Sequence, residues 1–190
     1  MRKQNGAIEK PTKVTYFTAH GPFEVPIRNA KKSKVLAIKH LEEFWSKDRE
    51  FSSLSKRERE LRSLSEMRGC YVFAIKASKG YTPWYIGKTK RSFSRECFDN
   101  DKLVYYMDAM ADKNGTPVMF FLAVKKPGPL HRVIGRVENH FIQTGFLRNP
   151  DLKNKRGKAE QIWGIKGVIQ GGQGNHGKGA LEFKKLFGLN

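Results

Sequence analysis

Two short stretches decide the fold, GCYVFAI at residues 69–75 and WYIGKT at residues 84–89. Both are rich in aromatic and β-branched residues, which favour β-strands. The polar segment between them carries Ser78, Gly80 and Pro83, residue types that favour turns, so the two stretches are predicted to form a β-hairpin. Each stretch places a tyrosine close to a glycine, and the second leads into a basic segment that is predicted to be helical.

The whole chain is strongly basic. Its 190 residues include 37 Lys and Arg against 18 Asp and Glu, a formal net charge of +19. Such an excess repels itself in the compact state, so we expect an anionic partner. Nucleic acid, and DNA in particular, is the first candidate, because phosphate neutralisation drives most non-specific binding. A host whose proteins are generally basic is the alternative explanation.

The sequence predicts a cytoplasmic protein with no membrane partner. Residues 1–10 have no apolar segment behind their charges, so we expect no secretory signal. No apolar run approaches the roughly 20 residues that span a bilayer. The two cysteines, Cys70 and Cys97, fit a reducing compartment, and sequence alone does not decide whether they form a disulfide. The five histidines and two cysteines show no zinc-ligand spacing.

The first 67 residues are predicted to form an extension that packs on the following domain. Their pattern changes from strand-like alternation to helical spacing. The expected elements are strands at 14–18 and 23–27 around a Gly21-Pro22 turn, a helix from Ser33 to Trp45, and a second helix over 54–67.

The central hairpin is followed by a regular alternation of elements. The apolar run at 116–124 is typical of a strand covered on both faces, and the apolar spacing over 130–145 predicts an amphipathic helix that carries Glu138. The remaining expected elements are two helical pieces at 91–98 and 103–111, and a C-terminal segment, 158–190, with a strand at 163–169, a glycine-rich loop and a closing helix.

This order of elements resembles the GIY-YIG nuclease domain over residues 68–157. Gly69-Cys70-Tyr71 and Tyr85-Ile86-Gly87 stand where the family has its two name-giving tripeptides, with a cysteine in place of the usual β-branched residue. The resemblance implies an α+β fold in which a small three-stranded antiparallel sheet is flanked by helices. The segments on either side then form N-terminal and C-terminal extensions.

The resemblance also implies which residues form the active site. Arg95, ten residues after Tyr85, corresponds to the arginine that the family carries on a helix. Glu138 corresponds to the glutamate of a later helix. Asn154, preceded by Pro150, corresponds to the asparagine near the end of the domain.

The activity that the resemblance implies is metal-dependent hydrolysis of DNA phosphodiester bonds. One carboxylate on a rigid helix, Glu138, can hold a single Mg²⁺ or Mn²⁺ ion. In the family pattern Tyr71 assists the attacking water, and Tyr85 positions it or relays its proton. Because a tyrosine pKa of about 10 makes a poor base, we expect nearby cations, Lys88 first, to lower it. Arg95 is expected to bind the scissile phosphate through its planar guanidinium.

Supporting roles fall to further residues. We expect Gly87 to let the backbone approach the phosphate, and Asn154 to orient the glutamate helix or the site. The basic residues expected to contact nucleic acid are Lys90, Arg91, Lys153, Lys155, Arg156 and, in the glycine-rich loop at 171–179, Lys178.

The sequence leaves several alternatives open. The residue-level alternatives are ordinary cross-strand packing for Tyr71 and Tyr85, an exposed ion pair of Glu138 with Arg136 or His140, an inward Glu96 in place of Arg95, and Asn149 in place of Asn154. At the level of function, one alternative is a nucleic-acid-binding protein that keeps the fold with weak or no cleavage. Another is an accessory protein whose residues 1–67 dock on a larger repair or restriction assembly.

Overall fold

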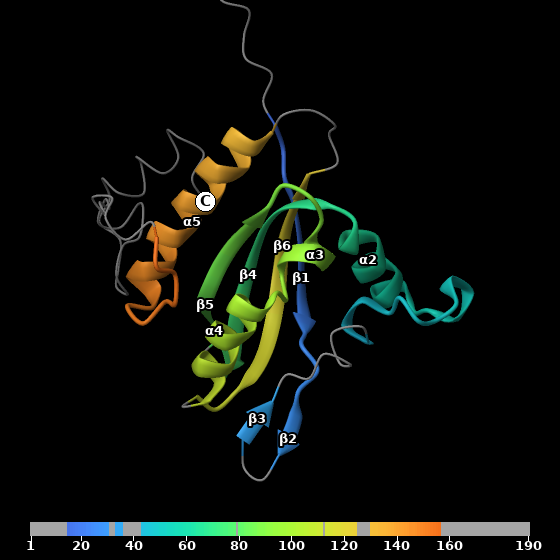
Figure 1. Ribbon diagram of the computed structural model, residues 1–190, viewed down its shortest axis with the longest axis horizontal. Helices are drawn as coiled ribbons and strands as arrows, with labels where there is room; N and C mark the ends of the chain where they lie inside the picture. The colour runs from blue at the N-terminus through green and yellow to red at the C-terminus, as the bar shows by residue number, and fades with distance from the viewer. Residues whose placement is uncertain are drawn as a thin grey trace, which may run out of the picture.

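A computed structural model describes residues 15–30, 33–35, 43–78, 80–111, 113–124 and 130–156. The described part is an α+β fold built on a four-stranded antiparallel sheet (Figure 1). The expected strand at 163–169, the glycine-rich loop with Lys178 and the closing helix lie outside the described residues, as do residues 1–14.

The main sheet has the strand order β1-β6-β4-β5. A separate two-stranded hairpin, β2-β3, stands beside it. The strands are β1 (Thr18–Glu24), β2 (Arg28–Ala30), β3 (Ser33–Val35), β4 (Arg68–Ala77), β5 (Gly80–Thr89) and β6 (Thr116–Val124).

The predicted central hairpin is confirmed, because β4 and β5 pair antiparallel from Gly69 opposite Thr89 to Ala77 opposite Gly80, with one register shift between Phe73 and Ala74. Gly80 has a φ of 107°, a conformation that favours glycine and that lets the chain reverse here. The predicted apolar strand is also confirmed as β6, which lies between β4 and β1.

The predicted N-terminal hairpin is wrong. Gly21 and Pro22 lie inside β1, at an irregularity of the pairing between His20 and Phe23, and β1 pairs with β6 instead of folding back on itself. The sheet therefore has four strands where three were expected. Gly21 has a φ of 117°, and a Cβ at this position would lie 2.8 Å from the Met119 carbonyl oxygen. The turn-forming residues thus allow a bulge next to β6 rather than a turn.

The helices largely follow the predicted spacing. The predicted helix from Ser33 to Trp45 is wrong at its start, because residues 33–35 form β3; residues 36–42 lie outside the described part. The second predicted helix is confirmed as α2, which begins with a capping box between Ser55 and Glu58. The helical elements are η1 (Phe51–Ser53), α2 (Lys56–Ser65), α3 (Phe93–Glu96), α4 (Asn100–Ala111) and α5 (His131–Arg148).

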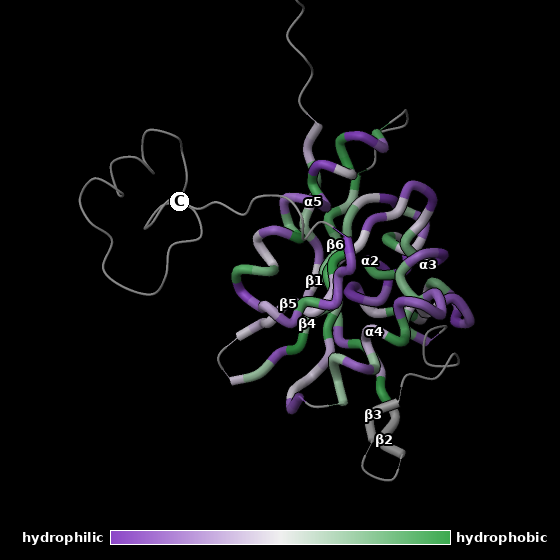
Figure 2. Tube along the Cα trace, turned by 60° about the vertical axis from the view of Figure 1, so that its left-hand side comes forward, coloured by the Kyte–Doolittle hydropathy of each residue, from purple (hydrophilic) through white to green (hydrophobic). Residues whose placement is uncertain are grey.

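Helices cover both faces of the sheet, and Figure 2 shows hydrophobic residues along the strands between them. Alternate residues of β4 serve the two layers. Tyr71 and Phe73 pack in the larger core with α2, α3 and α4, whereas Cys70 packs with Ile134 of α5. Cys70 and Cys97 are buried in these different layers and both are free, so they form no disulfide. In the part of the chain described, no helix is long and apolar enough to cross a bilayer.

Candidate functional site

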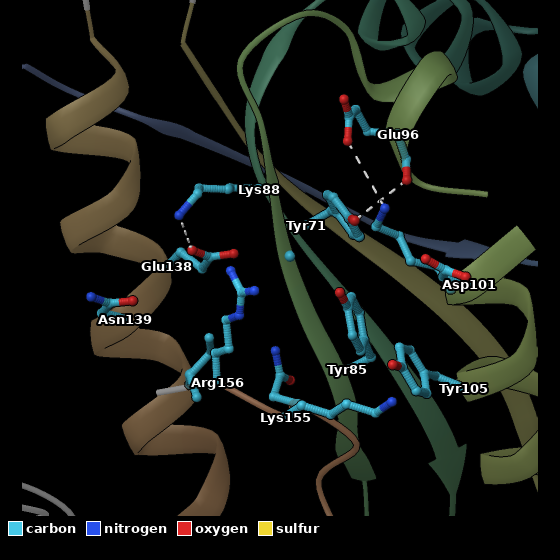
Figure 3. Close-up of a pocket in the computed structure, with 14 residues that line it drawn as sticks. Tyr71, Tyr85, Lys88, Glu96, Asp101, Tyr105, Glu138, Asn139, Lys155 and Arg156 are labelled. Atoms are coloured by element: carbon cyan, nitrogen blue, oxygen red, sulfur yellow. Dashed lines mark hydrogen bonds and ion pairs between the residues drawn. The ribbon is translucent and has the colours of Figure 1, made fainter. Parts of the chain in front are cut away.

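A pocket of about 570 Å³ opens at the edge of β5, between α5 on one side and α4 on the other (Figure 3). The strands β4 and β5 form its floor, and the segment after α5 forms one end. The lining residues are Tyr71, Tyr85, Gly87, Lys88, Glu96, Asp101, Lys102, Tyr105, Glu138, Asn139, Ile142, Asn154, Lys155 and Arg156.

Glu138 reaches the pocket from the inner face of α5. It lies four residues after Ile134 and four before Ile142, both buried against the sheet, so its side chain faces the same way. Lys88 Nζ on β5 lies 2.5 Å from Glu138 Oε2. The Glu138 side chain is only 13% exposed. The expected alternative, an exposed ion pair with Arg136 or His140, is therefore replaced by a half-buried pair across the pocket.

The two tyrosines lie on the α4 side of the sheet, with ring centroids 6.3 Å apart. Tyr71 is opposite Gly87 and Tyr85 is opposite Phe73, which makes the tyrosines diagonal neighbours across the hairpin. Tyr71 is fully buried, and its hydroxyl lies 3.5 Å from the Glu96 carbonyl oxygen. Tyr85 is half-buried and directs its hydroxyl toward the pocket (Figure 3).

Both tyrosine pKa values lie above the ordinary value, contrary to the expectation that Lys88 lowers them. Burial is the main cause for both residues. Burial, helped by the charge of Glu138, raises the pKa of Tyr85 to about 12. Lys88 forms an ion pair with Glu138, so its charge does not stabilise a phenolate. Both hydroxyls are therefore protonated at neutral pH and can donate hydrogen bonds.

Gly87 makes room for Tyr71 rather than for a ligand. A Cβ at Gly87 would overlap Cζ and Oη of the tyrosine and would lie 2.8 Å from its Cε2. The ring of Tyr71 therefore occupies the space that a side chain on β5 would fill. The expectation that Gly87 serves a close approach of phosphate gains no support from this packing.

The wall formed by α4 carries residues that the sequence did not single out. Tyr105 stacks on Tyr85 with ring centroids 5.5 Å apart. Lys102 is ion-paired with Asp99, and its Nζ lies 3.9 Å from Glu96 Oε2. The amphipathic spacing of α4 predicted a helix here, but it did not reveal that the first turn faces a pocket.

Arg95 does not join the pocket. It is exposed on α3. A hydrogen bond from Lys47 is the largest cause of the lowered pKa of Glu66, the residue after α2, and the positive charge of Arg95 adds to this lowering. Its neighbour Glu96 lines the pocket instead, as the alternative expectation allowed. Successive side chains of a helical turn point in different directions, so Arg95 and Glu96 of α3 face different sides.

Asn154 fastens the segment after α5 to the edge of β5. Its Oδ1 accepts a hydrogen bond from the Ile86 N–H at 3.0 Å, and its Nδ2 donates to the Ile86 carbonyl oxygen at 2.6 Å. Asn149 donates from Nδ2 to the Pro83 carbonyl oxygen at 2.7 Å. Both asparagines thus bind β5, but only Asn154 lines the pocket. Its role is to position backbone rather than to react.

The basic residues proposed for nucleic acid divide into two groups. Lys155 and Arg156 line the pocket. Lys90 and Arg91 are exposed on the turn after β5, outside the lining. Lys153 also lies outside it, with Nζ 2.5 Å from Asp108 Oδ2.

The donor set suits at most one weakly held hard cation. Among the described residues there is no group of three or more His, Cys, Asp or Glu side chains that could bind a metal ion. Mg²⁺, however, is commonly bound by one or two carboxylates, with water and phosphate completing its shell. Glu138 on the rigid helix α5 fits that requirement, provided that the ion competes with Lys88 for the carboxylate.

Comparison with known proteins identifies no relative: no family model, no curated protein and no solved structure matches this chain.

Proposed function

We propose that this protein is a metal-dependent endonuclease of GIY-YIG type that hydrolyses DNA phosphodiester bonds. The observation that supports this most strongly is the pocket itself. Two tyrosines from paired strands, a lysine and a helical glutamate, far apart in sequence, line one cavity. Lys88, Lys102, Lys155 and Arg156 give this cavity more cationic than anionic side chains, in a chain of net charge +19.

In this proposal each side chain has a role that its surroundings permit. Glu138 would hold one Mg²⁺ or Mn²⁺, which would supply positive charge for the developing phosphoryl oxyanion. Lys88, next to that carboxylate, neutralises charge on a phosphoryl oxygen. Tyr85, protonated at neutral pH, orients the attacking water by hydrogen bonding instead of removing its proton. Tyr71, fully buried, supports the floor of the site.

Incubation of the purified protein with supercoiled plasmid and Mg²⁺ or Mn²⁺ tests the proposal. The wild-type protein is expected to nick the plasmid, and EDTA or Glu138→Ala to abolish nicking. Glu66→Ala is the matched control, because Glu66, the residue directly after α2, is an exposed carboxylate outside the pocket. Equal nicking by the wild type and Glu138→Ala, or no nicking by either, would remove the proposal.

The second candidate is a nucleic-acid-binding protein of the same fold without cleavage. The exposed position of Arg95 and the pairing of Lys88 with Glu138 favour it. This candidate predicts salt-sensitive binding to DNA that needs no metal ion and survives Glu138→Ala. Binding with these properties, together with the absence of nicking, would select it over the endonuclease.

A further inference from the structure

We infer that Arg156, and not Arg95, is the arginine that binds the scissile phosphate in this pocket. The inference rests on the proposed function and names a residue role within it. A planar guanidinium suits a phosphate because it can donate two parallel hydrogen bonds. The position of Arg156 follows from how its segment runs along β5.

The segment 153–156 lies alongside the outer edge of β5 and runs in the same direction. The Lys153 N–H donates to the Trp84 carbonyl oxygen at 2.9 Å. One residue later, the side chain of Asn154 pairs with both backbone groups of Ile86. Continuing in this direction brings the segment toward Lys88, where the pocket opens.

The same edge presents a backbone donor to the pocket. In an antiparallel pair the backbone groups of alternate residues point to opposite sides of the strand. Since the N–H and C=O of Ile86 point away from β4 to Asn154, those of Lys88 point the same way. Asn154 thus covers Ile86, and the next outward N–H, that of Lys88, faces the pocket.

Arg156 lines the pocket and directs its guanidinium toward the side on which Glu138 lies (Figure 3). Within the described residues, no carboxylate lies within 4.0 Å of its nitrogens. Each of the other cations of the lining already contacts another side chain. Lys88 pairs with Glu138, Lys102 pairs with Asp99, and Lys155 lies over the Tyr105 ring at 5.5 Å.

This arrangement assigns a phosphate position between the Arg156 guanidinium and the outward N–H of Lys88. Asn154 is then the positioning residue, because its two buried hydrogen bonds hold the backbone that carries Arg156. Asn154 and Arg156 are only two residues apart, so loss of the Asn154 hydrogen bonds would move the Arg156 guanidinium directly. Arg95 on α3 has no part in the site.

The test compares Arg156→Ala, Arg156→Lys and Arg95→Ala in single-turnover cleavage of a short duplex. Arg156→Ala should lower the rate by about 10²–10³-fold, the usual effect of removing one transition-state donor. Arg156→Lys should recover only part of this, because lysine cannot reproduce the bidentate geometry. Arg95→Ala, an exposed substitution, should stay within about twofold of the wild type. All three variants should melt at the wild-type temperature, since both arginines are exposed.

A substrate with a stereodefined phosphorothioate at the scissile position separates contact from structure. The wild type should be slowed by one sulfur isomer, and Arg156→Ala should lose that sensitivity while Arg95→Ala keeps it. Asn154→Ala should show the same loss of sensitivity, and the double variant with Arg156→Ala should be no slower than Arg156→Ala alone.

The outcomes distinguish this assignment from the proposed function. If the wild type cleaves and Glu138→Ala does not, but Arg156→Ala cleaves as fast as the wild type, the assignment is overturned and the function stands. If the wild type cleaves nothing, the proposed function fails, and affinity for the uncleaved duplex decides the assignment. The phosphate-binding role of Arg156 then stands, without a scissile phosphate, if Arg156→Ala weakens binding more than Arg95→Ala does, and it falls if the two variants bind alike.

Discussion

Substitution of Gly87 by alanine probes the packing that places Tyr71. The added Cβ would overlap the end of the Tyr71 side chain, whose ring is fully buried and packs edge-on against Phe93 at 6.4 Å. The ring cannot turn out to solvent, so either it or β5 must shift. Overpacking of this kind usually costs about 1–3 kcal/mol of unfolding free energy. The same shift would move the Tyr71 hydroxyl away from the Glu96 carbonyl oxygen.

Urea denaturation of a double-mutant cycle measures this cost. Tyr71→Leu removes the atoms that the new methyl group would meet. In that background, Gly87→Ala should therefore change the unfolding free energy by less than about 0.5 kcal/mol, so that the coupling energy is close to the single-variant loss. If Gly87→Ala is neutral or stabilising when Tyr71 is present, the explanation of Gly87 as space for the tyrosine ring is wrong.

Three further predictions concern the edge of β5, the buried phenol and the charge of the chain. Asn154→Ala should lower the urea midpoint with an unchanged m-value, and should cost about 2–4 kcal/mol, because it removes two hydrogen bonds and leaves both backbone groups of buried Ile86 unpaired; a loss below about 0.5 kcal/mol would contradict the pairing. The pKa of Tyr85 rises from 10.0 to about 12 on folding, so its stabilising contribution is full below pH 10 and is lost as the pH rises toward 12. The unfolding free energy should thus fall more steeply in this window for the wild type than for Tyr85→Phe, and parallel curves would argue against a buried phenol. Finally, the affinity for DNA should fall with salt with a log–log slope of about −0.9 for each phosphate contacted, and a slope near zero would argue against nucleic acid as the partner.

The fold was predictable wherever local pattern and tertiary pairing agree. The strands β4, β5 and β6 and the helices α2, α4 and α5 have the residue spacing that their burial requires, so their positions follow from the sequence. The pairing of β1 did not follow from it. Gly21-Pro22 is a strong local turn signal, but the free edge of β6 provides a longer partner for the whole strand. Pairing between strands so far apart in sequence cannot be read from the residues of β1 alone.

The candidate site was predictable to a similar degree. One pocket is lined by four residues that the sequence analysis placed in the site, namely Tyr71, Tyr85, Lys88 and Glu138. Arg95 does not line it, because one additional residue along a single helical turn decides whether a side chain faces the pocket, and the sequence does not define the start of so short a helix.

The pKa expectation failed for a different reason. A lysine three residues after a tyrosine, directly after the Tyr85-Ile86-Gly87 tripeptide, suggests a cation that stabilises the phenolate. Lys88, however, points to the opposite face of the sheet from Tyr85 and Gly87, where it meets Glu138. Burial then acts on the tyrosines without opposition from a nearby positive charge and raises the pKa of both. Lys88 is close to Tyr85 in sequence, but the pleat of β5 places the two side chains on opposite faces of the sheet.

The most direct test of the central claim is the single-turnover rate of phosphodiester cleavage at saturating Mg²⁺, for the wild type and Glu138→Gln. Glutamine keeps the shape of the side chain and a hydrogen-bond acceptor for Lys88, so the fold should persist while the charge that would bind the ion is lost. The account predicts that the cleavage rate falls by about 10³-fold or more, while Glu66→Gln cleaves at the wild-type rate. Equal rates for Glu138→Gln and the wild type would contradict a catalytic site in this pocket.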